Sequence, residues 1–283
     1  QHAMTRTSSE IEIVRDQPCM TRPYTRFIAA ALLLTMGTRA ESAPETVRIE
    51  GTTVTFDLVP TPGGEIELDG QTTTIAPLMV GITEVTWELY DIFLYGLDIP
   101  EEDKTIDGIT RPSKPYVPPD RGYGHAGYPA MGMTRHAAME FCRWLSQKTG
   151  ATYRLPTKAE WIHLASAGGG ETGGAWHEDN ADYTTHPVAK QAPNAFGLHD
   201  MLGNVAEWIS PQEGERPQDN ATAMGGSFLD MPARCTPTAE QTRDASWNIS
   251  DPQIPKSMWW LADCDFVGFR IVREVPSQQK GDE

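Results

Sequence analysis

The sequence predicts a loop-rich α+β fold with few short strands and two to three helices. Its 25 glycines and 22 prolines, among 283 residues, are too many for a helical bundle. Two kinds of hydrophobic periodicity support this class: apolar and polar residues alternate in several short runs, and a few longer runs have helical spacing. Because 39% of the residues are hydrophobic, the chain is able to bury a core, and its length suits one or two domains.

Short runs of alternating apolar and polar residues predict the strands. Residues 47–59 alternate on both sides of a glycine and predict a hairpin. Residues 65–69 and 78–82 predict two further strands, and residues 266–272 predict a closing strand. Between the last two of these runs, the sequence beyond residue 195 predicts tight turns and short strands.

Two longer segments have the periodicity of amphipathic helices. Residues 84–95 begin near Thr86, a candidate N-cap, and stop before a glycine. Residues 135–148 follow Thr134, carry apolar residues at helical spacing and end at Gly150. Both segments are therefore predicted to be helices that bury one face.

A third helix is predicted after a short strand at residues 153–156. Thr157 and Glu160 have the spacing of a capping box, in which each side chain accepts a hydrogen bond from the other residue's backbone amide. Residues 97–130 are rich in proline and glycine and predict one long surface loop. The segments on either side of this loop are too small to fold as separate domains.

A secretory signal peptide is predicted at residues 20–40. It has a basic start, a ten-residue apolar run that is too short to span a membrane, and small residues before a cleavage point after Ala40. The alternative is a short buried helix. Residues 1–19 are interpreted as an upstream remnant or a misassigned start, the mature domain as residues 41–273, and residues 274–283 as a polar tail. The protein is therefore expected to be exported, either to a periplasm or out of the cell.

Composition limits the partners and the cysteine chemistry. The formal net charge is −16 and no run of Lys and Arg occurs, which excludes a nucleic-acid partner. The mature domain contains no candidate membrane span and keeps three cysteines, so at most one disulfide forms. A bond between Cys235 and Cys264 is left open, whereas Cys142 lies on the buried face of its helix and is interpreted as an inert core thiol.

The most informative stretch of the chain is residues 194–208. Asp200 and Glu207 lie seven residues apart on either side of a turn that contains Gly203. Gly203 allows the backbone to curl so that main-chain carbonyls point in the same direction as the two carboxylates, and hard cations bind such oxygen donors. From these residues alone, a calcium site and a solvated acidic turn both remain open.

Several stretches together resemble the formylglycine-generating enzyme and sulfatase-modifying factor family. The most specific are RLPT followed by EW at residues 154–161 and NAFGLHDMLGN at residues 194–204. The other matching stretches are, in chain order, residues 59–64, 84–86, 138–146, 207–208, 225–228 and 267–270. They extend over most of the mature domain.

This resemblance implies an α+β fold of the C-type-lectin-like kind and a calcium site. Carried over position by position, the implied calcium ligands are the side chains of Asp200 and Glu207 and the main-chain carbonyls of Gly203 and Val205. Calcium is therefore the expected cofactor.

The copper site of the family is where this chain departs from the pattern. The resemblance implies Cu(I) between two cysteines that are five residues apart after a Gly-Gly-Ser motif, and the corresponding positions here are Asp230 and Cys235. A carboxylate is a hard ligand that suits Cu(I) poorly. Ala206 also replaces the usual aromatic residue, and Glu240 stands where an arginine is common. Formylglycine generation is therefore not expected, and neither copper nor iron is supported; Cys235 and Asp230 remain the candidate catalytic residues if the chain is an enzyme.

The histidines show no spacing typical of an iron site. His163 is interpreted as a surface or packing residue. His177, Asp179, Asp182 and His186 form a loose polar group, which is interpreted either as a second cation site or as a solvated loop.

Trp247, Trp259 and Trp260 lie in one segment that the resemblance places near the rim of a pocket. Aromatic side chains at a rim suit recognition of a peptide or a sugar, whereas two of the three are expected to fill the core instead. The favoured function is a calcium-stabilised binding module whose ligand is a protein, a peptide or a glycan. The alternative is an exported tailoring enzyme of the oxidoreductase type.

Overall fold

Residues 43–104, 108–115, 117–168 and 174–275 are described in a computed structural model. The chain divides into residues 1–40 and residues 41–283, and every described residue belongs to the second unit. The predicted signal peptide and most of the predicted polar tail lie outside the described residues. Within the described ranges, no helix is both long enough and apolar enough to cross a membrane.

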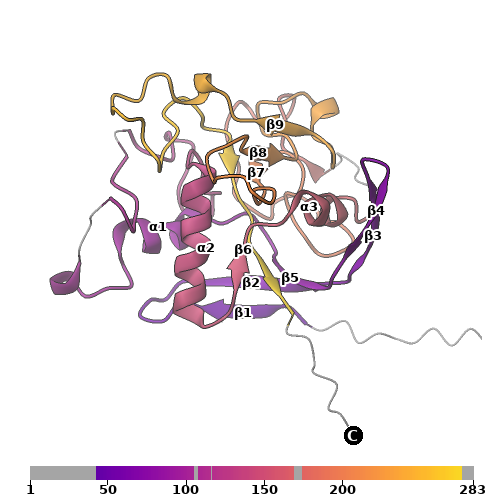
Figure 1. The fold of residues 1–283 in the computed structure, drawn as a ribbon, viewed down its shortest axis with the longest axis horizontal. Helices are drawn as coiled ribbons and strands as arrows, with labels where there is room; N and C mark the ends of the chain where they lie inside the picture. The colour runs from indigo at the N-terminus through magenta and orange to yellow at the C-terminus, as the bar shows by residue number, and fades with distance from the viewer. Residues whose placement is uncertain (1–42, 105–107, 116, 169–173, 276–283) are drawn as a thin grey trace, which may run out of the picture. The chain divides into compact units, whose positions relative to one another are not determined.

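A five-stranded antiparallel sheet forms the base of the fold, as seen in Figure 1. The strand order is β1-β2-β5-β11-β6, with the bounds β1 (Glu45–Arg48), β2 (Thr55–Thr61), β5 (Leu78–Gly81), β11 (Val272–Glu274) and β6 (Tyr153–Arg154). The predicted hairpin is confirmed, because β1 and β2 pair directly, with Val47 opposite Phe56. The sheet joins the start, the middle and the end of the domain.

A second, four-stranded sheet has the order β10-β7-β8-β9 and lies above the first in Figure 1. Its strands are β7 (Ala206–Trp208), β8 (Thr222–Met224), β9 (Glu240–Thr242) and β10 (Val267–Gly268). Strands β10 and β7 run parallel, and the other pairs are antiparallel. Strand β7, which contains Glu207, is one of the two inner strands of this sheet.

The prediction of one closing strand over residues 266–272 is wrong. The chain leaves the second sheet after β10 and enters the first sheet at β11, so residues 269–271 belong to neither. The alternation is broken by Arg270, whose side chain is fully buried where the pattern places a polar residue outside. The two short strands thereby connect the two sheets.

A separate hairpin of β3 (Gly64–Leu68) and β4 (Gln71–Ile75) follows β2. The strand at 65–69 is confirmed, whereas β4 was not predicted from its Gln-Thr-Thr-Thr-Ile sequence. Asp69 and Gly70 link the strands with φ values of 52° and 76°. An Asp-Gly pair is the usual signal for such a turn, and it was available in the sequence.

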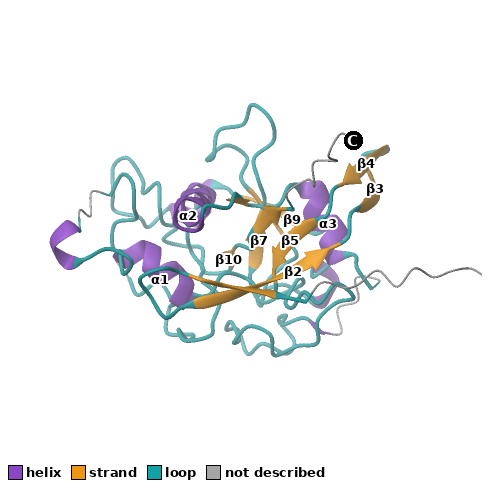
Figure 2. Cartoon of the chain, turned by 90° about the horizontal axis from the view of Figure 1, so that it is seen from below, coloured by secondary structure: helices purple, strands orange, loops and turns teal. Residues whose placement is uncertain are grey.

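The three predicted helices are confirmed as α1 (Trp87–Tyr95), α2 (Arg135–Thr149) and α3 (Lys158–Ala165). Thr134 caps α2 by accepting a hydrogen bond from the amide of Ala137 at 3.2 Å, and Gly150 ends that helix in the left-handed conformation. Figure 2 shows that loops make up much of the chain between these elements. The predicted loop-rich α+β class is therefore confirmed.

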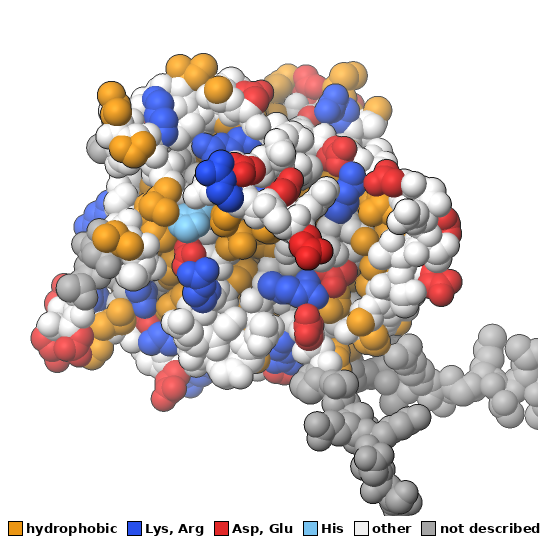
Figure 3. All heavy atoms as spheres, viewed as in Figure 1, with side chains coloured by type: hydrophobic (Ala, Val, Ile, Leu, Met, Phe, Trp, Pro, Cys, Tyr) orange, Lys and Arg blue, Asp and Glu red, His pale blue; other side chains and the backbone are white. Residues whose placement is uncertain are grey.

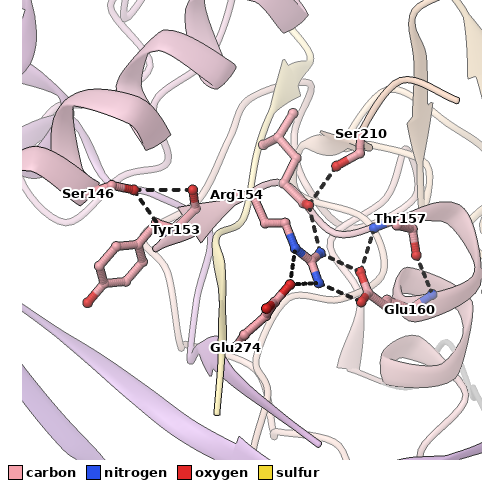
Figure 4. A network of polar contacts seen from close by, with 8 residues as sticks. Ser146, Tyr153, Arg154, Thr157, Glu160, Ser210 and Glu274 are labelled. Carbon is pink, nitrogen blue, oxygen red and sulfur yellow. Dashed lines mark hydrogen bonds and ion pairs between the residues drawn. The ribbon is translucent and has the colours of Figure 1, made fainter. Parts of the chain in front are cut away.

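The capping box of α3 belongs to a polar network that ties the helix to the first sheet (Figure 4). Thr157 and Glu160 make the two reciprocal hydrogen bonds. Arg154 on β6 donates to both carboxylate oxygens of Glu160, at 2.7 and 2.8 Å, and also reaches Glu274 on β11 at 3.4 Å. The network fixes the start of α3 against two strands of the sheet.

Helices α1 and α2 pack through aromatic side chains. Tyr90 and Phe93 of α1 contact Phe141 of α2, with ring centroids 5.6 and 5.8 Å apart. Cys142 lies in the same core at 3% exposure, as predicted, and burial raises the pKa of its thiol. Cys142, Cys235 and Cys264 are free thiols in the described part of the chain.

His125 fastens the long loop to α1. Its Nε2 lies 2.8 Å from the carboxylate of Asp91 on α1, its Nδ1 lies 3.1 Å from the carboxylate of Asp120, and its ring stacks on Trp87. Burial lowers the pKa of His125, but the hydrogen bonds and charges of the two carboxylates outweigh it, and the net shift is upward. The folded state therefore favours the imidazolium form.

This contact predicts a pH-dependent contribution to stability. The contribution is complete below the unfolded-state pKa of about 6.5 and is lost as the pH rises through the higher folded-state value. We expect wild type to be more stable than His125→Gln at pH 5.5, by less than about 1 kcal/mol because the pair is partly exposed. The difference in free energy of unfolding should shrink by pH 8.5 and should be smaller throughout in an Asp120→Asn background. A difference that grows with pH would contradict the assignment.

Candidate functional site

The predicted calcium stretch forms a buried turn that leads into β7. Asp200, Gly203 and Asn204 have φ values of 53°, 74° and 54°, so the backbone enters the left-handed region three times within five residues. Gly203 has no room for a side chain, because a Cβ atom there would lie 2.1 Å from the carbonyl oxygen of Trp176. This geometry agrees with the expectation that Gly203 allows the backbone to turn tightly.

Glu207, at the centre of β7, forms a buried ion pair with Arg270. The guanidinium Nε lies 3.1 Å from both carboxylate oxygens, Nη2 lies 2.8 Å from Oε1, and Trp161 Nε1 donates to Oε2 at 2.9 Å. The two side chains are 1% and 0% exposed. Both oxygens of Glu207 are therefore engaged by protein donors.

Arg270 also holds two backbone segments. Its Nη1 donates to the carbonyl of Gly81 at the end of β5, and its Nη2 donates to the carbonyl of His199, both at 2.7 Å. Burial opposes the charge on Arg270, but Glu207 and the neighbouring carboxylates raise its pKa. One guanidinium thus connects both sheets with the turn that precedes β7.

Two further carboxyl groups lie next to this pair, and together the four residues Glu84, Asp200, Glu207 and Arg270 are called the acidic cluster below. The Oδ2 atom of Asp200 accepts from the amide of Ala189 at 2.7 Å, and the Oε1 atom of Glu84 accepts from Asn204 Nδ2 at 3.0 Å. The other oxygen of each, Asp200 Oδ1 and Glu84 Oε2, is buried without a hydrogen-bond partner. Burial raises the pKa of all three carboxyl groups, and Arg270 opposes that shift.

The donor chemistry of the acidic cluster fits a hard cation. Of the three carboxyl groups, Glu207 forms the ion pair with Arg270, and the unpartnered oxygen of Asp200 is the kind of donor that calcium binds. Glu207 is less available, because Arg270 and Trp161 occupy both its oxygens. In the described ranges, no three His, Cys, Asp or Glu side chains converge as a metal site.

Glu84 and Arg270 were not identified as site residues from the sequence. Both lie in stretches that carry the family resemblance, but no spacing rule connects residue 84 with residue 204 or residue 270 with residue 207. The only local signal was the charge at position 270 inside an apolar run. The fold brings these residues together, and the sequence shows only their presence.

Cys235 and Asp230 lie on the segment that follows β8. Cys235 is fully buried, its Sγ donates to the carbonyl of Ser227 at 3.8 Å, and Gly226 packs directly against it. Burial, together with the charge of Asp230, raises the pKa of this thiol to about 12. A sulfur atom in this environment is protonated at neutral pH and is not exposed to solvent.

Asp230 caps a turn. One of its oxygens accepts from the amide and the hydroxyl of Ser227, at 2.9 and 2.8 Å, and Gln241 Nε2 donates to both oxygens. Arg234 lies 3.7 Å away. The position that is the first cysteine in the copper pattern is thus occupied by a carboxylate with several hydrogen-bond partners.

The family assignment rests on a match over most of the domain. The family model for the sulfatase-modifying factor enzyme 1-like domain matches residues 34–275. The chain belongs to this family. This match confirms the resemblance seen in the sequence. The buried turn before β7 lies within the matched residues.

Solved structures of the same type support the fold of this sulfatase-modifying factor domain. Treponema denticola variable protein 1 superposes with a TM-score of 0.58 at 19% identity, covering 83% of this chain and 100% of that protein. PvdO from Pseudomonas aeruginosa superposes with a TM-score of 0.57 at 22% identity, with the same coverage. At these identities the likeness shows the fold alone.

Curated relatives of this sulfatase-modifying factor domain match over shorter stretches. The chain is 36% identical over 121 residues to serine/threonine-protein kinase pkn1 of Chlamydia pneumoniae, which is 36% of this chain and 18% of the kinase. It is 29% identical over 110 residues to the formylglycine-generating enzyme of Mycobacterium tuberculosis, which is 31% of this chain and 34% of that enzyme. The chain thus spans about a third or less of the curated relatives it matches.

The remaining predicted positions have structural roles. Ala206 is fully buried in β7, and Glu240 is exposed on β9, where it pairs with Lys158 at 2.8 Å. His163 packs against Phe196, and its Nε2 lies 3.0 Å from the carbonyl of Pro62, as expected for a packing residue.

The loose polar group between the two specific sequence blocks is spread along a loop. His186 stacks on Trp176 with ring centroids 3.8 Å apart, and its Nε2 lies 3.1 Å from the carbonyl of Ala181. His177 accepts a hydrogen bond from the amide of Asp179 within a turn. These contacts favour the solvated-loop interpretation over a second cation site.

All three tryptophans of the C-terminal segment are buried, where two were expected to be. Trp247, Trp259 and Trp260 are 9%, 2% and 8% exposed. Trp260 also lines a cavity. The expectation of an aromatic residue beside a pocket therefore holds for Trp260, which is also part of the hydrophobic core.

Proposed function

We propose that this chain is an exported binding module of the sulfatase-modifying factor family that is stabilised by calcium and does not generate formylglycine. The observation that carries this proposal is the carboxylate at position 230, where the copper pattern has its first cysteine. Asp230 is engaged by Ser227 and Gln241, and the remaining thiol, that of Cys235, is fully buried with a raised pKa. A pair of accessible thiolates, which Cu(I) requires, is not available at these positions.

Export is supported by the pattern of residues 20–40 alone. The ligand of the module is a protein, a peptide or a glycan. The alternative of an oxidoreductase-type tailoring enzyme gains no support from the geometry, because the Cys235 thiol is fully buried and both oxygens of Asp230 accept hydrogen bonds from the protein.

An activity assay tests the absence of formylglycine generation. The full chain would be incubated under oxygen with copper and a peptide that carries the Cys-x-Pro-x-Arg target pattern. We expect no conversion of the thiol to the aldehyde by mass spectrometry, because one thiol beside a carboxylate does not provide the two soft ligands that Cu(I) needs. The formylglycine-generating enzyme of Mycobacterium tuberculosis serves as the positive control. Turnover by this chain would refute the proposal.

Calcium would be held by the side chains of Asp200 and Glu207 and the carbonyls of Gly203 and Val205. When bound, the ion supplies positive charge to a cluster of three carboxyl groups. The unpartnered Oδ1 atom of Asp200 supports this assignment, and Arg270 would have to share Glu207 with the ion. The ion would act on stability and would hold the turn before β7.

Chelation tests the calcium proposal. A ligand that binds only the folded state at about one hundred times its Kd contributes about 2.7 kcal/mol, which corresponds to about 5–10 °C for a domain of this size. We therefore expect the melting temperature to fall by that amount in EGTA and to recover with calcium. Asp200→Asn should reduce the effect of the chelator, and an equal melting temperature in calcium and EGTA would contradict the proposal.

A further inference from the structure

A cavity of about 350 Å³ lies away from the acidic cluster, between the long loop and the C-terminal segment. One wall comes from residues 113–115 and 117–121, and the other from residues 248–263, with Met131 and Gly132 between them. Figure 1 shows these two loops side by side at the upper left. The volume is near the lower end of the range for ligand sites in proteins.

Hydrogen bonds hold the two walls together. Trp259 Nε1 donates to the carbonyl of Gly108, Trp260 Nε1 donates to the carbonyl of Ser113, and Arg121 Nη2 donates to the carbonyl of Ala262, each at 2.7 Å. These bonds connect segments that are far apart in sequence. The cavity is therefore formed before any ligand arrives, which reduces the ordering that binding requires.

Polar side chains of the wall, among them the buried Asn248 and Asp251, form hydrogen bonds within the wall itself. Asp251 accepts from the amides of Gln253 and Ser257, at 2.9 and 2.6 Å, and Asp263 accepts from the amide of Ser250 at 2.7 Å. Asn248 accepts from the amide of Ala262 at 2.8 Å. A glycan is recognised through unengaged polar side chains, and these are not free to serve it.

The cationic side chains that line the cavity, Lys114 and Arg121, keep donor groups that the wall does not use. Lys114 is exposed and forms no ion pair with any described residue, and Arg121 uses only Nη2 in its hydrogen bonds there. Both stand in a chain with a net charge of −16. Asp251 and Asp263 also line the cavity, so the lining as a whole is not positively charged, but their carboxylates already accept hydrogen bonds from the wall. Lys114, which has no ion-pair partner among the described residues, therefore favours an anionic group on the ligand.

Large apolar side chains are exposed around the cavity. Val117 lines it, and Ile249, Ile254 and Met258 belong to the 248–263 segment without lining the cavity themselves, with exposures of 45%, 68%, 98% and 41% in that order. Figure 3 shows hydrophobic side chains at the upper left, where this wall reaches the surface. Such side chains beside a cavity are typical of a surface that another molecule covers.

We propose that this cavity binds a peptide segment in which a carboxylate lies next to an aliphatic or aromatic side chain. The carboxylate meets Lys114 and Arg121, and the apolar side chain covers Val117 and Ile254. The inference deepens the proposed binding function. It does not depend on calcium, because none of the lining residues belongs to the acidic cluster.

The test uses the full chain and fluorescent hexapeptide pools that contain one Asp flanked by Leu or Phe. We expect binding by fluorescence polarisation, and weaker binding of a matched pool with Asn in place of Asp. Lys114→Gln should weaken the binding of the Asp pool about tenfold, the usual size of a charge-assisted hydrogen bond. Lys190→Gln is the matched control, because it removes the same charge from an exposed loop elsewhere.

A second variant tests the apolar part. Ile254→Ser should weaken binding several-fold without affecting folding, because the side chain is 98% exposed. Leu97→Ser, at an exposed site at the end of α1, should leave binding unchanged. Equal binding of the Asp and Asn pools, equal effects of the two lysine variants, or no peptide binding would each overturn the proposal.

Competition by chitohexaose or maltohexaose without peptide binding would assign the cavity to a glycan and would also overturn it. The outcome is separable from that of the proposed function. Turnover in the formylglycine assay would refute the proposed function. Peptide binding at the cavity would still be tested independently, by comparing Lys114→Gln with Lys190→Gln and Ile254→Ser with Leu97→Ser.

Discussion

Arg270→Met should destabilise the domain by about 3–5 kcal/mol, because it leaves the carboxylate of Glu207 buried without its partner. The side chains of the pair are 0% and 1% exposed, so water does not replace the lost contacts. The carbonyls of Gly81 and His199 also lose their donors at the same time. Because the free energy of unfolding of a domain is typically about 5–15 kcal/mol, this single change removes a large part of it. Urea unfolding followed by tryptophan fluorescence measures the loss.

Two further variants show whether the lost ion pair is the cause. Arg216→Ala removes an arginine whose pair with Asp219 is on the surface, with 79% of the Arg216 side chain exposed, and should cause no measurable change. Arg270→Met combined with Glu207→Gln should be less destabilised than Arg270→Met alone, because no charge is then left buried. A loss from Arg270→Met no greater than that from Arg216→Ala would show that Arg270 does not hold the two sheets and the turn together.

The elements that could be predicted from the sequence are those fixed by neighbouring residues. Thr134 and Gly150 delimit α2, and Thr157 with Glu160 starts α3, through contacts within one helical turn. The acidic turn was located for the same reason, because the two carboxylates and Gly203 lie within eight residues. The relationship of the chain to the sulfatase-modifying factor family could also be predicted, from the stretches at residues 154–161 and 194–204.

The features that could not be predicted depend on contacts between distant segments. Glu84 meets Asn204 across 120 residues, and Arg270 meets Glu207 across 63. These contacts draw Arg270 inward, which splits the predicted closing strand and places an arginine inside an apolar run. The cavity beside Trp260 has the same origin, since its walls are 147 residues apart at the hydrogen bond to Ser113.

Gly203→Ala should be the second severe change, at about 2–5 kcal/mol. Its Cβ would lie 2.1 Å from the carbonyl oxygen of Trp176 and 2.9 Å from the carbonyl carbon, and backbone atoms do not swing aside as the end of a side chain does. Overpacking typically costs about 1–3 kcal/mol, and a non-glycine residue at a φ of 74° adds about 1–2 kcal/mol. The free energy of unfolding in urea measures the sum.

Gly214→Ala separates the clash from the conformational strain. Gly214 has a φ of 84°, and a Cβ atom there would meet no other atom within 4 Å, so alanine suffers only the left-handed strain of about 1–2 kcal/mol. The excess loss in Gly203→Ala therefore measures the cost of moving the segment that carries Trp176. Equal losses at the two glycines would show that the turn has room to adjust.

Gly203→Ala also tests whether the turn is part of the proposed calcium site. If the carbonyls of Gly203 and Val205 are ligands, a displaced turn loses affinity for the ion, and the melting temperature of Gly203→Ala should change less on addition of EGTA than that of wild type. Gly214→Ala should keep the full response to the chelator. A full response in Gly203→Ala would mean that the ion is held by the carboxylates without this turn, and the ligand set would then have to exclude the two carbonyls.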